Sequence, residues 1–345
     1  MTRKLLLLLL LPLFSCETKP KTIVYTPQES GSKSHIRGLM AVNDSVCWYS
    51  ASKGIVGLTM DGGKSWTTTT VQGADSLDFR DIEAFSGKRA LILSAGSPGR
   101  IYLTENAGLN WKMVHEDTRP EIFYDGMDFA NKLDGAVYGD PINGEQQVLH
   151  TANGGMTWEK VSVSSDDVPI LKQEAGFAAS GSGLAYLANG EIIYGLGGDQ
   201  ARTISYNTKV KKASVSSTPL SHGAPAKGIY SIAFKDNLNG LAVGGEYLDS
   251  TMNNSSMAIT TDGGKTWTLP SQPAKGYTSS VCYVPDSDIA VAVGRYGSYL
   301  SEDNGMTWRK TDKEAFYTVS FSPSGKYGWV AGAYGKIARI EIRRE

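Results

Sequence analysis

The fold is decided by the stretch Thr260-Thr261-Asp262-Gly263-Gly264-Lys265-Thr266-Trp267. Residues 59–66, 104–111, 151–158 and 301–308 share its spacing: a hydroxyl residue, Asp or Asn two positions later, a Gly and a closing Trp. The tryptophans are 45, 47, 109 and 41 residues apart. The long gap spans about two periods, so one unit has lost its motif, and its remnant is expected at residues 205–208. Short strands repeating at this period predict a β-propeller with four strands per blade.

The repeated acidic or amide residue is interpreted as part of a turn. Its side-chain oxygen can accept hydrogen bonds from backbone N–H groups of a tight hairpin, and the Gly supplies a positive φ. Asn serves in two copies, which a turn acceptor tolerates and a catalytic acid would not. The pattern resembles the Asp-box, or BNR repeat, whose Trp is expected to pack between neighbouring blades. The predicted structural positions are Asp61, Asn106, Asn153, Asp262 and Asp303.

Counting repeat units gives seven blades. Their inner strands are expected to begin near His35, Phe79, Phe123, Glu174, Ile229, Tyr277 and Phe316. The last unit ends at residues 336–342 without a box and lacks an outermost strand. Residues 22–26 form a strand with no other partner, so we expect them to pair there and close the ring, which removes two open sheet edges. The sequence therefore predicts an all-β, seven-bladed propeller over residues 22–345.

The first residues predict a targeting signal. Arg3 and Lys4 precede an apolar run at residues 5–11, and Leu13-Phe14-Ser15-Cys16 follows. This resembles a bacterial lipobox, which implies a signal peptide over residues 1–15, acylation of Cys16 and a tether over residues 16–21. The alternative is an ordinary secretory signal in which Cys16 is incidental. The lipobox predicts a protein anchored by lipid in the cell envelope, at the outer membrane or periplasmic face of a Gram-negative-type bacterium.

Composition limits the function classes. The net charge of −1 argues against a nucleic-acid binder, which is usually strongly basic. Beyond Cys16, only Cys47 and Cys282 remain, both in apolar strand-like runs, and free thiols are favoured over a disulfide. The four histidines lack ligand spacing, so no metal is expected. No dinucleotide fingerprint, haem motif or Cys cluster occurs, so no cofactor is expected either.

Topology predicts which face binds a ligand. In an up-and-down blade, Asp-boxes on the turns between strands 3 and 4 leave the starts of the inner strands on the opposite face, beside the loops between strands 2 and 3. Charges and tyrosines flanked by Gly at a channel mouth suit a recognition site. The alternative is a set of satisfied salt bridges that plug the channel. The candidate ligand-binding residues are Arg37, Arg80, Asp81, Tyr124, Asp125, Asp128, Asp140, Glu174, Arg202, Tyr230, Glu246 and Arg295.

The inner-strand motifs carry a family resemblance. Residues 34–39, 78–82, 123–129, 139–141, 174–180 and 244–247 resemble bacterial propellers related to the photosystem II stability/assembly factor. The resemblance covers essentially the whole mature chain. It implies a seven-bladed binding or assembly platform for a protein or glycan ligand, as a monomer or as a subunit of an envelope complex. A photosynthetic role does not follow from it.

The main enzymatic alternative is a sialidase-like glycoside hydrolase, because sialidases also carry Asp-boxes. Such an enzyme needs three arginines around a carboxylate, a Tyr activated by Glu and an acid/base Asp. Arginines are available, but Arg37 is followed by Gly38-Leu39 where an Arg-Ile-Pro signature is expected. A pair such as Asp81 with Asp125 could serve another glycosidase or lyase. Catalysis therefore stays open, and a buried carboxylate pair at the channel mouth would distinguish it from a charged binding rim.

Overall fold

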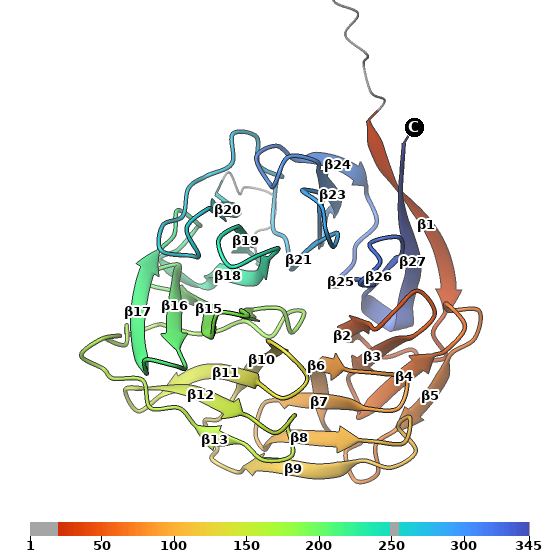
Figure 1. Ribbon diagram of the computed structural model, residues 1–345, viewed down its shortest axis with the longest axis horizontal. Coiled ribbons are helices and arrows are strands. Elements are labelled where there is room, and N and C mark those ends of the chain that lie inside the picture. Colours follow the sequence, from red (N-terminus) through yellow and green to blue (C-terminus); the bar gives the residue numbers. More distant parts are fainter. Residues whose placement is uncertain (1–19, 249–254, 345) are drawn as a thin grey trace, which may run out of the picture.

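The computed structural model describes residues 20–248 and 255–344, and in this part of the chain seven blades surround a central channel (Figure 1). Blade 1 contains β2 (Ile36–Ala41), β3 (Cys47–Ala51), β4 (Ile55–Thr59) and β5 (Thr67–Thr70). Blade 2 contains β6 (Asp78–Ala84), β7 (Ala90–Ala95), β8 (Gly99–Thr104) and β9 (Lys112–Asp117). Blade 3 contains β10 (Tyr124–Phe129), β11 (Gly135–Ile142), β12 (Glu145–Thr151) and β13 (Glu159–Lys160).

The second half of the ring repeats this plan. Blade 4 contains β14 (Leu184–Tyr186), β15 (Glu191–Gly198), β16 (Arg202–Asn207) and β17 (Lys212–Ser217). Blade 5 contains β18 (Ala224–Phe234), β19 (Gly240–Glu246) and β20 (Met257–Thr260), with a single bridge from Ile259 to Thr268 in place of a fourth strand. Blade 6 contains β21 (Ser280–Tyr283), β22 (Ala290–Gly294), β23 (Gly297–Ser301) and β24 (Arg309–Asp312). Blade 7 contains β25 (Thr318–Phe321), β26 (Gly328–Ala331), β27 (Lys336–Arg344) and β1 (Lys21–Glu29).

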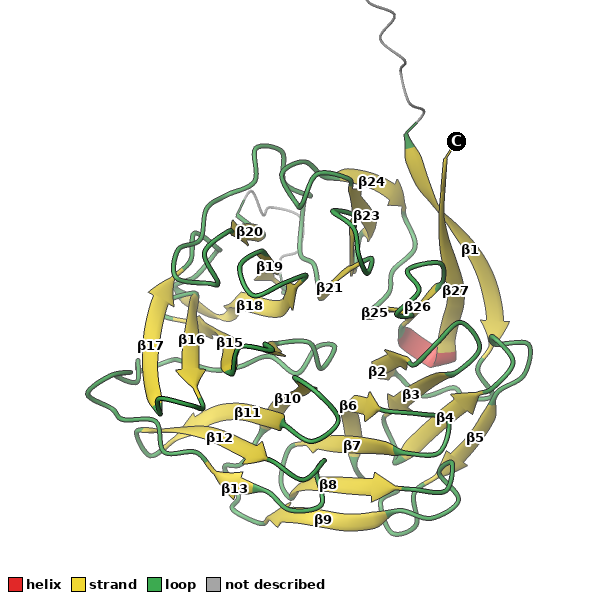
Figure 2. Ribbon diagram, viewed as in Figure 1, coloured by secondary structure: helices red, strands yellow, loops and turns green. Residues whose placement is uncertain are grey.

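The predicted all-β propeller is confirmed. Figure 2 shows strands and loops throughout, with one short 3₁₀ helix, η1 (Ala333–Gly335), among the described residues. Each sheet packs both faces against neighbouring blades, so β22 is buried along its whole length, and the apolar clusters lie between sheets. This is why its sequence reads as a continuous apolar run instead of an alternating one.

The Asp-box motifs lie on the turns between the third and fourth strands. Asp262 Oδ1 accepts hydrogen bonds from Thr266 N (2.9 Å) and Thr260 Oγ1 (2.8 Å). The two residues that follow Asp262 in the motif, Gly263 and Gly264, have positive φ (77° and 82°), a conformation in which an L side chain would be strained. Gly263 N also donates to Leu238 O on the turn between the first two strands. Both kinds of turn therefore share one side of the ring, which we call the Asp-box face.

The ring is closed by β1, as predicted. This strand pairs antiparallel with β27 over nine residues, from Lys21 opposite Arg344 to Glu29 opposite Lys336. Gln28 then joins the last blade to the first. Its Nε2 donates to Gly62 O (2.9 Å), and its Oε1 accepts from the indoles of Trp66 and Trp329 (3.2 Å each).

One strand differs from the prediction. The inner strand of blade 4 was expected near Glu174 but is β14, which begins at Leu184. Gly181, with φ of 76°, and Gly183 interrupt a β conformation before that point, and residues 175–182 form a loop with a single bridge from Ala175 to Gly197.

The remaining predictions concern the motif remnant, the two cysteines and the N-terminal signal. Asn207, in the expected motif remnant, accepts hydrogen bonds from Lys209 N and Val210 N on the turn between β16 and β17. Cys47 and Cys282 are free thiols, as predicted. The predicted signal (1–15) and Cys16 lie outside the described residues. Within the described chain, no helix is long and apolar enough to cross a membrane.

Candidate ligand-binding rim

The channel mouth opposite the Asp-box face, which we call the rim, is covered by a loop. Residues 175–182, the plug, run from beside β15 toward the centre of the ring (Figure 1). Gly176 N donates to Asp140 Oδ1 (2.7 Å), and Ser180 Oγ donates to Ser279 O (2.8 Å). Gly176 is required by space, since a Cβ there would lie 2.2 Å from Asp125 Oδ2. The plug is thus hydrogen-bonded to both blade 3 and blade 6.

Arg37 and Arg80, at the starts of β2 and β6, converge on this plug. Arg37 Nη1 donates to Ala179 O (3.2 Å), and Arg80 Nη1 donates to Ala178 O (3.3 Å). Arg80 also pairs with Asp78 through Nε (2.8 Å). No carboxylate in the described residues forms an ion pair with half-buried Arg37. Burial and the Arg80 guanidinium lower the pKa of Arg37, which marks a cation whose charge is incompletely compensated.

Aromatic side chains surround Arg37 on the rim. Its guanidinium lies 4.7 Å from the ring centroid of Tyr317, an arrangement that stabilises a cation. His35 lies beside Tyr317 and beside Tyr334, which is 77 % exposed. These rings form a surface with both apolar and polar groups beside the Arg37 guanidinium.

A second aromatic group lies across blades 4 to 6. Phe177, on the plug, stacks on Tyr230 with ring centroids 3.9 Å apart. Tyr277 meets the edge of Tyr230 (4.8 Å) and lies 6.5 Å from the exposed ring of Tyr247. Tyr230 donates its hydroxyl to Ala226 O (2.9 Å), so this predicted site residue contributes a ring face and no free hydroxyl.

The two carboxylates that most resemble a catalytic pair, those of Asp125 and Asp140, lie beneath the plug. Asp125 is 1 % exposed, and within the described chain neither of its carboxylate oxygens has a hydrogen-bond partner. Burial, and next the neighbouring Asp140, raise the pKa of Asp125 well above its ordinary value. Burial also raises the pKa of Asp140 to about 6. The Tyr138 hydroxyl is likewise buried without a partner. Asp125 and Tyr138 are thus closed to solvent, while Asp140 is half-buried.

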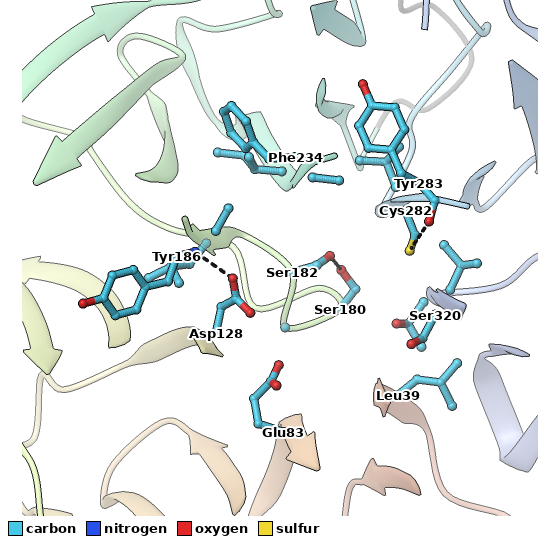
Figure 3. Close-up of a pocket in the computed structure, with 18 of the residues that line it drawn as sticks. Leu39, Glu83, Asp128, Ser180, Ser182, Tyr186, Phe234, Cys282, Tyr283 and Ser320 are labelled. Carbon is cyan, nitrogen blue, oxygen red and sulfur yellow. Dashed lines mark hydrogen bonds between the residues drawn. The ribbon is translucent and has the colours of Figure 1, made fainter. Parts of the chain in front are cut away.

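Two other predicted acids face the channel below the plug, where a cavity of about 470 Å³ extends toward the Asp-box face (Figure 3). Asp81 accepts from Met127 N (2.6 Å) on the next blade, and Asp128 accepts from Tyr186 N (2.7 Å) on the blade after that. Burial raises the pKa of Asp81 to about 8 and that of Asp128 to about 6. The two acids thus connect consecutive inner strands through these hydrogen bonds. Glu83 also points into the cavity.

Other predicted residues lie away from the rim centre. Tyr124 shares a hydrogen bond with His115 Nε2 (3.0 Å) in the apolar layer between blades 2 and 3. Glu174 and Arg202 form a buried ion pair that fixes the crossover before the plug.

The last two predicted residues belong to the outer part of the rim. Glu246 pairs with Lys227 (3.3 Å), and exposed Arg295 donates to Tyr247 O (3.4 Å). Their charges are thus oriented by neighbours in blade 5.

Sequence reasoning predicted tyrosines at the rim but missed the plug and three of the aromatic residues, Phe177, Tyr277 and Tyr317. Phe177, Tyr277 and Tyr317 each stand near an expected strand start, so aromatic residues recurring at that position were an available signal. The plug had no comparable signal, because its small residues also suit a strand. Within the described residues, no group of three His, Cys, Asp or Glu side chains could hold a metal ion.

Comparisons with known proteins agree with this architecture. The family model for the BNR/Asp-box repeat matches residues 258–269. No curated protein sequence matches the chain. A solved structure described as YCF48 bound to D1 peptide has a TM-score of 0.65 at 14 % identity, covering 91 % of this chain and 96 % of that chain.

Two further solved structures show the same fold. YCF48 from Cyanidioschyzon merolae gives a TM-score of 0.65 at 15 % identity, covering 93 % of this chain and 99 % of that chain. The structure of U3-55K gives 0.67 at 14 % identity, covering 93 % and 98 %. The chain therefore carries a BNR/Asp-box repeat and has a propeller fold similar to that of YCF48.

Proposed function

We propose that this propeller is a lipid-anchored envelope protein whose rim binds an acidic group of a protein ligand. The observation that carries the proposal is Arg37: a half-buried cation, without an ion-pair partner in the described chain, held against Tyr317 at the channel mouth. Its planar fork suits a carboxylate better than a lysine would. The similar YCF48 structure with a bound D1 peptide supports a peptide as the class of ligand.

The neighbouring groups favour binding over hydrolysis. The rings of Tyr317, Tyr334 and His35 offer apolar contact beside the charge, as in many recognition sites. Asp125 is buried beneath the plug, so a ligand at the rim would not meet it in its observed position, and half-buried Asp140 accepts a hydrogen bond from the plug at Gly176 N. Within the described residues, the predicted carboxylate pair of Asp81 and Asp125 is buried, with 5 and 1 % exposure.

The test compares Arg37→Ala with Arg100→Ala in capture of proteins from detergent-solubilised envelope. Arg100 is a matched control because it is on the same side of the ring but is paired with Glu116 at the outer strands of blade 2, outside the channel mouth. Arg37→Ala should lower the affinity for captured partners roughly tenfold or more, as expected for one charge-assisted contact. It should cost only about 1 kcal/mol of stability, because one hydrogen bond to a carbonyl is lost.

One outcome would contradict the rim assignment, and another would contradict the class of ligand. If Arg37→Ala unfolds readily while its folded fraction captures the same proteins, the arginine is a structural support of the plug. If a glycan array gives ligands that Arg37→Ala loses while protein capture is unchanged, the ligand is an acidic sugar.

The anchor is tested separately with Cys16→Ala. This variant should leave detergent-phase membrane fractions or accumulate as an uncleaved precursor. A cleaved variant that still partitions with membranes as the wild type does would show that Cys16 is not acylated.

A further inference from the structure

Exposed apolar side chains are distributed around the Asp-box face. Each of blades 1 to 6 presents at least one large apolar residue on a turn of this face, and these residues are between 41 and 78 % exposed. They are Met60, Leu109, Leu133, Met156, Val210, Leu238 and Met306. We call this set the apolar ring. The side chains of these residues take no part in the turn hydrogen bonds, which at the Asp-boxes use the neighbouring hydroxyl and Asp or Asn side chains.

The rim has a different surface. Its exposed large apolar or aromatic residues lie in blades 5 to 7 and are mostly tyrosines, Tyr247, Tyr296 and Tyr334, with one aliphatic residue, Leu248. Tyrosines suit contact with a wet protein or sugar ligand. Aliphatic tips at the ends of turns, beside exposed charged residues such as Lys64, Lys265 and Glu105, suit the boundary between lipid head groups and acyl chains.

The start of the described chain lies on the edge of the same face. Lys21, the first residue of β1, pairs with Arg344 at the end of β27, and Figure 1 shows these two ends side by side. Lys21 N donates to Glu302 Oε1 (3.0 Å), and Glu302 belongs to the Asp-box turn of blade 6. The five residues from Cys16 to Lys21 span at most about 18 Å when extended. A lipid on Cys16 would therefore hold the Asp-box face, and not the rim, near a bilayer.

We infer that the Asp-box face rests on the membrane surface, with the apolar ring inserted at the head-group boundary and the rim directed away from the lipid. This inference rests on the proposed lipid anchor. The tips are scattered over six blades, which a fluid lipid surface can accept individually. A protein partner would instead require a contiguous apolar patch. The arrangement leaves Arg37 and its aromatic neighbours open to a ligand approaching from the aqueous side.

The experiment uses the full-length processed protein in vesicles of phosphatidylethanolamine and phosphatidylglycerol. In a Cys282→Ser background, where the remaining free thiol of Cys47 is buried, a cysteine for an environment-sensitive fluorophore is introduced by Leu109→Cys or Met156→Cys on the apolar ring or by Tyr334→Cys on the rim. Quenching by aqueous iodide should be several-fold weaker at residues 109 and 156 than at residue 334. In detergent solution, the three labels should be quenched similarly, because all three positions are exposed.

The outcomes separate the inference from its premise. Equal quenching at both faces of vesicle-bound protein would overturn the orientation while leaving the anchor and the ligand rim intact. Protection of residues 109 and 156 only after addition of solubilised envelope proteins would also overturn it, because the apolar ring would then face a protein. A chain with Cys16 that fails to float with the vesicles would refute the anchor and the orientation together, whereas ligand capture by Arg37 is scored independently.

Discussion

The joint between the last and first blades should depend on one amide, that of Gln28. Gln28→Met keeps a side chain of similar length but removes three hydrogen bonds. One is donated to Gly62 O, and two are accepted from the indoles of Trp66 and Trp329. Trp329 is fully buried, so water cannot replace its lost acceptor. Each bond contributes about 1 kcal/mol net, and an unpaired buried donor costs more, so the expected loss of unfolding free energy is about 2–4 kcal/mol.

The control is Thr203→Val at the junction of blades 4 and 5. Thr203 Oγ1 accepts from the indole of Trp267 (3.1 Å), but that indole also donates to Gly264 O (3.1 Å) and keeps a partner in the variant. The control should lose about 1 kcal/mol or less. Urea unfolding followed by tryptophan fluorescence measures both variants. If Gln28→Met unfolds at the same midpoint as Thr203→Val, with unchanged slope, the amide does not hold the ring closed.

Two further predictions concern carboxylates. Asp262→Asn should be nearly silent, since Asn153 Oδ1 already accepts from Thr157 N (3.0 Å) in the equivalent turn, whereas Asp262→Ala should lose about 1–2 kcal/mol in the same urea assay. Equal loss of ligand capture in both Asp262 variants, with the fold intact, would give the box a chemical role. Burial raises the pKa of Asp140 to about 6 from an ordinary 3.8, so the folded chain holds this proton more tightly than the unfolded chain. The resulting stabilisation is full below the ordinary pKa and is lost as pH rises through about 6, so Asp140→Asn should flatten the fall in stability between about pH 4 and 7, and an unchanged pH profile would contradict this.

The architecture could be predicted because short sequence patterns specify its turns and strands. A turn motif with a fixed Trp spacing gives the blade period, and an unpartnered strand at residues 22–26 gives the closure that β1 and β27 make. The meeting of Arg37 and Arg80 also followed from topology, because both stand at inner-strand starts in adjacent blades. These features need only the order of strands and the side on which each turn lies.

The remaining details of the site depend on tertiary context. Asp81 and Asp125 both occur in inner-strand motifs, but Asp81 accepts a backbone N–H across a blade junction, whereas Asp125 is enclosed with no hydrogen-bond partner among the described residues. The plug at residues 175–182 decides which acids reach solvent, and nothing in its small side chains distinguishes a loop over the channel from a strand inside it. Burial and long-range contact therefore assign roles that residue type alone does not.

The closure of the last blade also sets an order of events during synthesis. Gln28 and its partner Trp329 are 301 residues apart in the sequence, and β1 has no sheet to join until β27 has been made. The ring therefore cannot be completed progressively from the N-terminus, and its first blade must wait with an open side while the others form. Such long-range pairing is slow, so the ring stays open between its first and last blades until its final strand has been made.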